Sequence, residues 1–295
     1  MHPPAQRIVS LLPGATEWVC KLGLEDRLVG VSHECDFPDL ARELPSVTRS
    51  RIASGLSSAE IDAEVREHCE TKTPLYELDE KRFVDLRPDL VLTQSLCNVC
   101  AVSERDVLTK TAGLSSPCQL LDLKAHTFRD IFSDARRIVE ATGSLQHSLD
   151  QIALLEARIK EVKQRSKKLS RRPVVTLLEW MDPLFCAGHW TPELIELAGG
   201  DDPIGNSGEP SRTIDSNELV RANPDMLLIA CCGMDQESGY TEAKRMEAMD
   251  FWTQLKCVEK EQVHVFDGSA WFNRPGPRLV DALEHVAKLI SQWSH

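Results

Sequence analysis

The chain has 295 residues, enough for two domain-sized cores, and its 42% hydrophobic and 27% charged residues are typical of a globular protein. The 34 Lys and Arg against 46 Asp and Glu give a net charge of −12, which disfavours nucleic-acid partners unless positive charge is concentrated locally. The basic segment from Lys163 to Arg172 has no interleaved aromatic residues. We interpret it as a solvated helix end and expect no nucleic-acid partner.

The first residues, MHPPAQRIVSLLPGATEW, lack the basic segment, apolar core and small-residue cleavage site of a secretory signal. No apolar run approaches the ~18 residues that a membrane span needs. We therefore expect no membrane insertion and a cytoplasmic location. The ten cysteines are too few for a disulfide scaffold, and several, such as Cys231, lie in apolar runs where a reduced thiol behaves as a small hydrophobe.

In the first half of the chain, short β-branched apolar runs alternate with longer amphipathic stretches, which predicts an α/β fold with a mostly parallel sheet. The predicted strands are 7–12, 28–31, 90–93 and 119–123. The predicted helices are 16–22, 58–70 and 127–142, and Gly23 and Gly143 are natural stops for the first and third of them.

A segment without Gly or Pro runs from Ser144 to about Leu169, and its apolar positions recur at three- and four-residue spacing. It predicts one helix of about 25 residues, about 38 Å long, which is long enough to join two lobes as a rigid link. The expected organisation is an N-terminal α/β lobe at 1–143, a linking helix at 144–171 and a C-terminal α/β lobe at 172–295.

After Pro173 the alternation of strands and helices resumes. The predicted strands are 174–178, 226–230 and 263–266, and the predicted helices are 192–198, 216–222, 242–254 and 278–293. The two halves share a local pattern, since FVDLRPDLVLT from Phe83 parallels ELVRANPDMLLI from Glu218, each placing Pro-Asp between a helix and a buried strand. This internal sequence similarity is consistent with two similar lobes.

Ligands of open α/β sheets bind beyond the carboxyl ends of the strands, so the loops after the predicted strands hold the candidate site residues. These loops are rich in acidic, imidazole, amide and aromatic side chains. The candidate ligand-binding residues are Glu17, His33, Glu34, Gln94, Trp180, Asp182, His189, Trp190, Trp271, Phe272 and Arg274.

Two of the loops contain metal-ligand residues. His33 and Cys35 are one residue apart, and Cys97 and Cys100 have the C-x-x-C spacing that lets two thiolates reach one ion. Four such ligands from neighbouring strand ends would form a tetrahedral zinc site or hold an iron ion. The alternative interpretation is reduced cysteines at the start of a helix beside a hydrogen-bonded histidine.

The same loops could also serve redox or metal-dependent catalysis. A C-x-x-C motif between a strand and a helix is also typical of redox-active cysteines, but the surrounding chain lacks the βαβ arrangement of a thioredoxin. The sequence contains no G-x-S-x-G, H-E-x-x-H, P-loop or G-x-G-x-x-G motif. A metal-dependent enzyme remains an alternative, in which Glu34, Asp182 or His189 acts as the acid or base beside the metal.

Aromatic residues are sparse at 5%, yet Trp180, Trp190, Trp271 and Phe272 all fall in predicted strand-end loops. Large apolar faces with one polar group suit a flat organic ligand or a macrocycle, and packing of these rings within their own lobe is the alternative. Arg274 has two interpretations, a bidentate contact to an anionic ligand group or a structural salt bridge.

Three segments carry a family resemblance: IVSLLPGATEWVCKLGLEDRLVGVSHECDFP, LYELDEKRFVDLRPDLVLTQSLCNVCAVS and RPGPRLVDALE. They resemble the cobalamin-binding subfamily of the helix-linked periplasmic receptors, which deliver corrinoids, ferric siderophores, haem or metal ions to ABC importers. The resemblance covers nearly the whole chain, and its motifs occur in matching order.

The resemblance implies two Rossmann-like lobes with mostly parallel sheets, one linking helix and a ligand held at the lobe interface. It also implies that acidic residues such as Glu17 dock onto arginines of a transporter, although the absence of an export signal does not support a periplasmic partner. The expected function is binding of a corrinoid or another metal chelate. The alternatives are the metal-dependent enzyme or metal-binding protein, and a scaffold that has lost its ligand and works through protein contacts.

Overall fold

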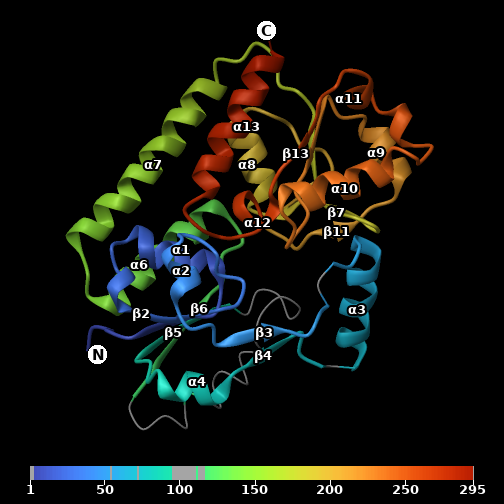
Figure 1. The fold of residues 1–295 in the computed structure, drawn as a ribbon. Coiled ribbons are helices and arrows are strands. Elements are labelled where there is room, and N and C mark those ends of the chain that lie inside the picture. The colour runs from blue at the N-terminus through green and yellow to red at the C-terminus, as the bar shows by residue number, and fades with distance from the viewer. Residues whose placement is uncertain (1–2, 54, 72, 95–110, 112–116, 295) are drawn as a thin grey trace. The chain divides into compact units, whose positions relative to one another are not determined.

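The computed structural model describes residues 3–53, 55–71, 73–94, 111 and 117–294 (Figure 1). The chain divides into two compact units. Unit 1 comprises Met1–Leu56, Ala63–Ala125 and Arg129–Leu154, and unit 2 comprises Ser57–Asp62, His126–Phe128 and Leu155–His295. Among the described residues, no helix is both long enough and apolar enough to cross a bilayer.

Unit 1 is built on a parallel sheet whose strand order is β2-β1-β5-β6. Its strands are β1 (Ile8–Ser10), β2 (Leu28–Val31), β5 (Leu90–Gln94) and β6 (Gln119–Leu123), and every neighbouring pair is parallel. A separate antiparallel pair is formed by β3 (Thr48–Ser50) and β4 (Tyr76–Leu78). The helices that lie wholly or mostly in unit 1 are α1 (Pro13–Lys21), α2 (Leu40–Glu43), α3 (Ser58–Thr71), α4 (Glu80–Asp85) and α6 (Phe128–Thr142).

Apolar side chains cover both faces of the unit 1 sheet. On one face, Val9 and Val91 of β1 and β5 pack in one cluster with Phe83 of α4. Elsewhere in the unit, Trp18 of α1 meets Phe132 of α6 edge to face, with ring centroids 5.6 Å apart. Strands covered on both faces read as continuous apolar runs, which is why the sequence predicted them.

Unit 2 contains a five-stranded sheet of order β11-β8-β7-β12-β13. Its strands are β7 (Val175–Met181), β8 (Leu184–Cys186), β11 (Arg212–Thr213), β12 (Met226–Ile229) and β13 (Val263–Val265). β7, β12 and β13 are parallel, whereas β8 and β11 are antiparallel to their neighbours. A small parallel pair consists of β9 (Gly188–His189) and β10 (Asn206–Ser207).

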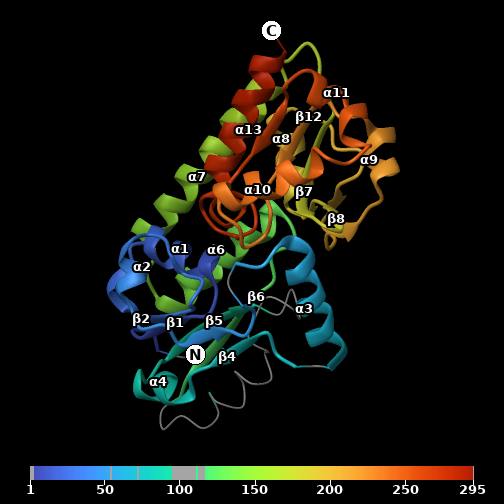
Figure 2. The ribbon, with the colours of Figure 1, turned by 45° about the vertical axis from the view of Figure 1, so that its right-hand side comes forward.

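Helices flank this second sheet, and α8 (Thr191–Ala198) packs against α13 (Leu279–Trp293), as Figures 1 and 2 show. Alternate residues of β12, Leu227 and Ile229, join a core cluster with residues of α9 (Ser216–Ala222), α10 (Gln236–Met246) and α11 (Lys256–Glu259). A short helix, α12 (Gly268–Trp271), precedes α13. The mostly parallel α/β fold predicted from the sequence is confirmed.

One long helix, α7 (Gln146–Ser166), runs unbroken from unit 1 into unit 2. Its 21 residues span about 31 Å. Near its start, Ser148 Oγ donates to the carbonyl of Leu22 in unit 1 at 2.9 Å. Farther along, Arg158 pairs with Asp281 and Glu284 of α13 in unit 2.

One predicted helix is wrong in its bounds. The expected helix at 242–254 lies at 236–246, and residues 252–254 form a separate 3₁₀ turn. Asp235 sets the start, because its carboxylate accepts a hydrogen bond from Ser238 N at 2.8 Å and so caps the helix. Apolar spacing alone does not reveal this cap, because the capping residue lies outside the apolar pattern.

Candidate functional site

In unit 1, the order of the sheet brings β1 beside β5, the point where the strand order reverses. Ligands of doubly wound sheets bind outside the carboxyl ends of the strands at such a point. Two predicted residues lie there: Gln94 ends β5 and is half-buried, and Glu17 lies on α1 directly after β1. Glu17 is only 2% exposed, so it is buried in this structure and not a surface group, and its docking onto a transporter stays a prediction.

His33 follows β2 and is held by the neighbouring strand β3. Its Nδ1 lies 2.7 Å from Thr48 Oγ1, and its backbone N–H donates to the same oxygen at 3.0 Å. Its ring meets Tyr76 edge to face, with centroids 4.9 Å apart. Nε2 lies 3.4 Å from Glu34 Oε1 without forming a hydrogen bond. The second ring nitrogen of His33 is therefore buried beside the Glu34 carboxylate without a hydrogen bond.

The predicted metal site is only partly visible. Cys97 and Cys100 lie outside the described residues, so their place relative to His33 stays a prediction. Cys35 is 6% exposed, and its Sγ lies 3.1 Å from Thr16 Oγ1 of α1, whereas the imidazole of His33 contacts β3. Within the described part of the chain, no three His, Cys, Asp or Glu side chains are grouped as metal ligands.

In unit 2, an irregularity in the pairing of β7 with β8 places Trp180 at the carboxyl end of the sheet. The register shifts between Leu178 and Trp180, as in a β-bulge. The indole Nε1–H of Trp180 is directed at two carbonyls, Ser58 O at 3.1 Å and Asp182 O at 3.2 Å. Asp182 itself is exposed in the turn between the two strands.

His189 and Trp190 form the aromatic centre of this edge. Their rings are stacked, with centroids 5.5 Å apart and an interplanar angle of 27°, and the ring of His126 lies 5.5 Å from that of His189. His189 has a left-handed backbone, with φ at 51°, and its buried Nδ1 has no hydrogen bond. Burial and the nearby His126 lower the pKa of His189, so its imidazole is neutral at physiological pH.

The loop after β13 supplies the remaining predicted residues. Trp271 and Arg274 are half-buried, and the ring of Trp271 meets His285 edge to face at 5.5 Å. Phe272 has no exposed surface and packs against Phe266 at 5.2 Å, so its side chain belongs to the core of unit 2. Its carbonyl accepts a hydrogen bond from Trp190 Nε1 at 2.8 Å, which ties this loop to the start of α8.

Sequence reasoning missed Glu179, which lies at the bulge next to Trp180. Its carboxylate accepts hydrogen bonds from Ser211 Oγ and, at 3.2 Å, from Gly188 N. Burial raises the pKa of Glu179 to about 7, and burial likewise raises the pKa of nearby Asp202 to about 6. A carboxyl that titrates near neutrality at a strand end is a mark of functional sites, but it depends on burial, which the sequence does not show.

A second missed group lies at the start of α3, in the short segment Ser57–Asp62 that belongs to unit 2. Ser58 is 1% exposed, and its hydroxyl donates to Glu242 Oε2 of α10. Arg245 pairs with the other oxygen of this carboxylate, which is 5% exposed. The sequence offered only a helix-start signal here, S-x-x-E at Ser57 to Glu60, with nothing to indicate Glu242.

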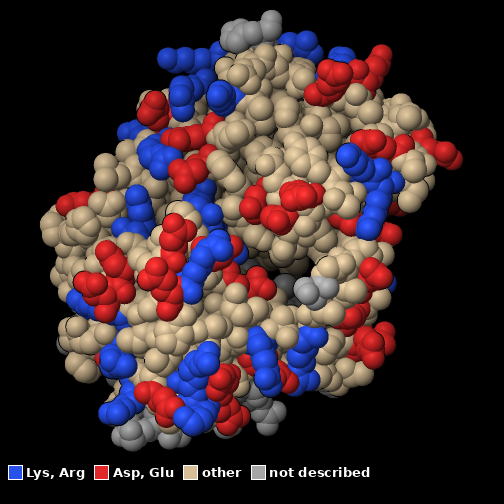
Figure 3. Space-filling model, in the orientation of Figure 1, with Lys and Arg blue, Asp and Glu red and all other residues tan. Residues whose placement is uncertain are grey.

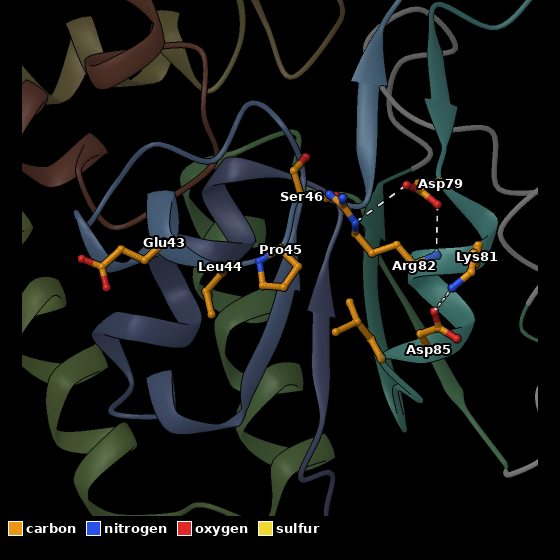
Figure 4. Close-up of a pocket in the computed structure, with 9 residues that line it drawn as sticks. Glu43, Leu44, Pro45, Ser46, Asp79, Lys81, Arg82 and Asp85 are labelled. Atoms are coloured by element: carbon orange, nitrogen blue, oxygen red, sulfur yellow. Dashed lines mark hydrogen bonds and ion pairs between the residues drawn. The ribbon is translucent and has the colours of Figure 1, made fainter.

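A hollow on unit 1 lies between the segment Glu43–Ser46 and α4 (Figure 4). Charged side chains at this hollow already have partners within the chain. Lys81 pairs with Asp85 at 2.7 Å, and Arg82 donates to the backbone carbonyl of Ser46 at 2.7 Å. Figure 4 shows these side chains along the rim of an open depression, and no aromatic ring lines it. The hollow therefore lacks the flat aromatic faces that suit a macrocycle.

Comparisons with known proteins agree with this architecture. Residues 8–270 match the family described as periplasmic binding protein, and the chain belongs to that family. The vitamin B12-binding protein of Vibrio cholerae is 24% identical over 97% of this chain and 90% of its own length. An uncharacterized ABC transporter substrate-binding lipoprotein of Bacillus subtilis, YvrC, is 21% identical over 97% of this chain and 80% of its own length.

Solved structures show the same fold. The periplasmic vitamin B12 binding protein BtuF of Vibrio cholerae superposes with a TM-score of 0.72 at 20% identity, covering 98% of both chains. The periplasmic heme-binding protein RhuT from Roseiflexus sp. RS-1 gives a TM-score of 0.73 at 18% identity, covering 99% of this chain and 100% of that one. The family resemblance and the fold expected from the sequence are therefore confirmed.

Proposed function

We propose that this chain binds a corrinoid or another metal chelate of similar shape through side chains at the carboxyl ends of its two sheets. The observation that carries the proposal is the stacked pair of His189 and Trp190, with Trp180 on the adjoining β7. Flat aromatic faces beside a few polar groups match a large, mostly apolar ring with polar substituents.

The names of the relatives support this class of ligand. Vitamin B12-binding and heme-binding proteins are among the proteins that match this chain over nearly its full length. Both ligands are planar macrocycles around a metal, so the chemistry common to them is a flat ring with an axial position on the metal.

Two imidazoles of the candidate site suit that axial position. His189 Nδ1 in unit 2 has no hydrogen bond, and neither has His33 Nε2 in unit 1. A neutral imidazole nitrogen is a good ligand for iron and cobalt. The chelate would bring its own metal, so this proposal does not require the site predicted at His33, Cys35, Cys97 and Cys100.

Isothermal titration with cobalamin, cobinamide and haemin tests the proposal. We expect saturable binding of at least one of them, and a His189→Ala variant weakens it tenfold or more if this imidazole contacts the metal. His68→Ala, on α3, is the matched control and leaves the affinity unchanged. Absence of heat with all three ligands would overturn the proposal, and a shifted absorption spectrum of haemin or cobalamin would identify axial ligation.

We also propose that residues 144–171 act as a linking segment between an N-terminal lobe (1–143) and a C-terminal lobe (172–295). Support comes from α7, which is unbroken from Gln146 to Ser166. Limited proteolysis tests this organisation: if the segment is a rigid link, a Gly-Gly insertion at Ala157 increases cleavage there and weakens ligand binding. An insertion without effect on either would contradict it.

The cytoplasmic location and the partner remain proposals as well. The eight cysteines in the described residues are free thiols, as a reducing compartment favours. In contrast, the name of the B. subtilis relative supports a partnership with an ABC transporter. Fractionation of cells that express the full natural chain, followed by immunoblotting, distinguishes a cytoplasmic protein from an exported one.

A further inference from the structure

The C-terminal end of α7 and the residues just after it differ in charge from the rest of the chain. Between Lys160 and Arg172 there are seven Lys or Arg and one acidic residue, Glu161, in a chain whose net charge is −12. Figure 3 shows Lys and Arg side chains gathered at this end of α7. Positive charge is therefore concentrated on one small surface.

The basic residues of this surface fall into two groups. Arg171 lies over the ring of Trp293 at 5.4 Å, Arg172 pairs with Asp201 at 2.7 Å, and Arg165 lies 4.0 Å from Glu161. Four lysines are exposed, and their side chains form no ion pair or hydrogen bond with any described residue. We name these four the lysine cluster: Lys160, Lys163, Lys167 and Lys168.

The lysine cluster lies on the last turns of α7 and the two residues that follow it. Lys160, Lys163 and Lys167 follow the i, i+3, i+7 spacing of one helix face, while Val162 and Ser166 are buried against unit 2. Upstream, Arg158 donates to Asp281 at 2.6 Å and to Glu284 at 2.8 Å, which holds α7 on α13. Lys160 and Lys163 thus lie on a rigid helix, Lys167 and Lys168 follow directly after its end, and all four side chains are exposed to solvent.

We propose that the lysine cluster is a docking surface for anionic lipid headgroups at a membrane surface. Lysine is a hydrated point charge that suits diffuse contact with a charged plane, whereas phosphate recognition at defined positions favours the arginine fork. Neither the hollow of Figure 4 nor the adjoining one around Thr48 is lined by a lysine of the cluster. Because no aromatic residue is interleaved with these lysines, the cluster matches a charged plane better than a nucleic-acid strand.

The acidic remainder of the chain does not cancel this attraction. At physiological ionic strength, charges farther apart than about 8 Å are largely screened, so the local charge governs the contact. Each lysine at an anionic surface strengthens binding about fivefold. Four lysines therefore predict weak, reversible and salt-sensitive association, not permanent anchoring.

Vesicle cosedimentation of the full chain tests the proposal, with phosphatidylcholine vesicles that contain or lack phosphatidylglycerol. We expect binding only to the anionic vesicles, decreasing as salt rises. The quadruple variant K160Q/K163Q/K167Q/K168Q should lose binding at least tenfold, which is less than the roughly 25-fold that two lysines supply. The control K81Q/K124Q/K244Q/K260Q has the same change in net charge and should remain within about twofold of the unchanged chain.

A thermal melt establishes that each variant is folded, and K167E/K168E, placed after the end of α7, gives a second test that spares the helix. Failure of the unchanged chain to bind anionic vesicles would overturn the proposal, as would equal losses in both quadruple variants. Stronger, cluster-dependent binding to a nucleic-acid duplex than to vesicles would instead identify a nucleic-acid surface. None of these outcomes depends on the proposed chelate binding.

Discussion

Trp190 donates its indole N–H to the carbonyl of Phe272 at 2.8 Å, joining two segments that lie 82 residues apart in the chain. Both side chains are almost completely buried, at 5% and 0% exposure. The carbonyl is therefore shielded from water, and the indole is its partner. This hydrogen bond holds the ring that stacks on His189 in a fixed orientation.

Replacing Trp190 by Phe tests the role of this bond. The ring remains, but the Phe272 carbonyl loses its donor in a buried place, so the free energy of unfolding should fall by about 1–3 kcal/mol. Urea denaturation measures the change. Trp293→Phe, near the end of α13, is the control and should change stability by less than about 1 kcal/mol. An unchanged stability for Trp190→Phe would show that water or another donor replaces the indole.

The pH dependence of stability should reveal Glu179. Its folded pKa of about 7 lies above the ordinary value of 4.5, so the folded state holds the proton more tightly. Stability attributable to this group is therefore highest at low pH and is lost as the pH rises from 4.5 toward 7. Glu179→Gln removes this dependence, and its unfolding free energy should exceed that of the unchanged chain at pH 8 by on the order of 1 kcal/mol.

Thermal melts of the Glu179→Gln variant and the unchanged chain measure this difference in stability. They should cover pH 5 to pH 8, about the range over which the Glu179 carboxyl titrates. Glu218→Gln is a useful contrast, because its hydrogen bond with Arg212 lowers the pKa of this carboxyl instead of raising it. Parallel pH profiles for the Glu179→Gln variant and the unchanged chain would contradict a buried, proton-binding carboxyl at the bulge.

The regular elements were largely predictable because their signal is local. Strands 28–31 and 119–123 lie at the residues expected, since each is an apolar run bounded by polar or turn residues. β10 and β11 were missed because two-residue strands such as Asn206–Ser207 and Arg212–Thr213 have no apolar run to mark them. Their pairing depends on tertiary contacts that a single sequence does not encode.

The candidate site was predictable only as a set of loops. Strand ends identified His33, Trp180 and Trp190, because the fold places such residues at one edge of each sheet. Their hydrogen-bond partners could not be predicted from the sequence. Thr48, on another strand, holds the ring of His33, and the carbonyl of Ser58 accepts the indole N–H of Trp180, which lies 122 residues away in the chain. Which aromatic residue is exposed and which is core, as with Phe272, also depends on packing.

Ser58→Ala tests the group at the start of α3. The substitution removes the hydroxyl that donates to Glu242, leaving a buried carboxylate that keeps Arg245 as a side-chain partner. Stability should fall by about 1–3 kcal/mol, as for loss of a buried hydrogen bond to a charged group. Thr241→Ala removes an exposed hydroxyl from α10 and is the control. Equal effects of the two substitutions in urea denaturation would contradict a specific role for Ser58.

A substitution at Gly188 tests how closely this residue must pack against the backbone of residues 209–211, beside Glu179. A Cβ at this position would lie 2.3 Å from Ser211 N and 2.7 Å from Glu209 O, and both are backbone atoms that cannot turn aside. Gly188→Ala should therefore push the 209–211 loop away, weaken the hydrogen bond from Ser211 to Glu179, and cost about 2–3 kcal/mol of stability.

The matched control for this substitution is Gly233→Ala, where an added Cβ meets no atom within 4 Å and the left-handed backbone, with φ at 75°, is the only source of strain. That strain costs about 1 kcal/mol. Chemical denaturation measures both variants. A smaller loss for Gly188→Ala than for Gly233→Ala would mean that the loop yields easily, and Glu179 would then keep its pH dependence without the close contact.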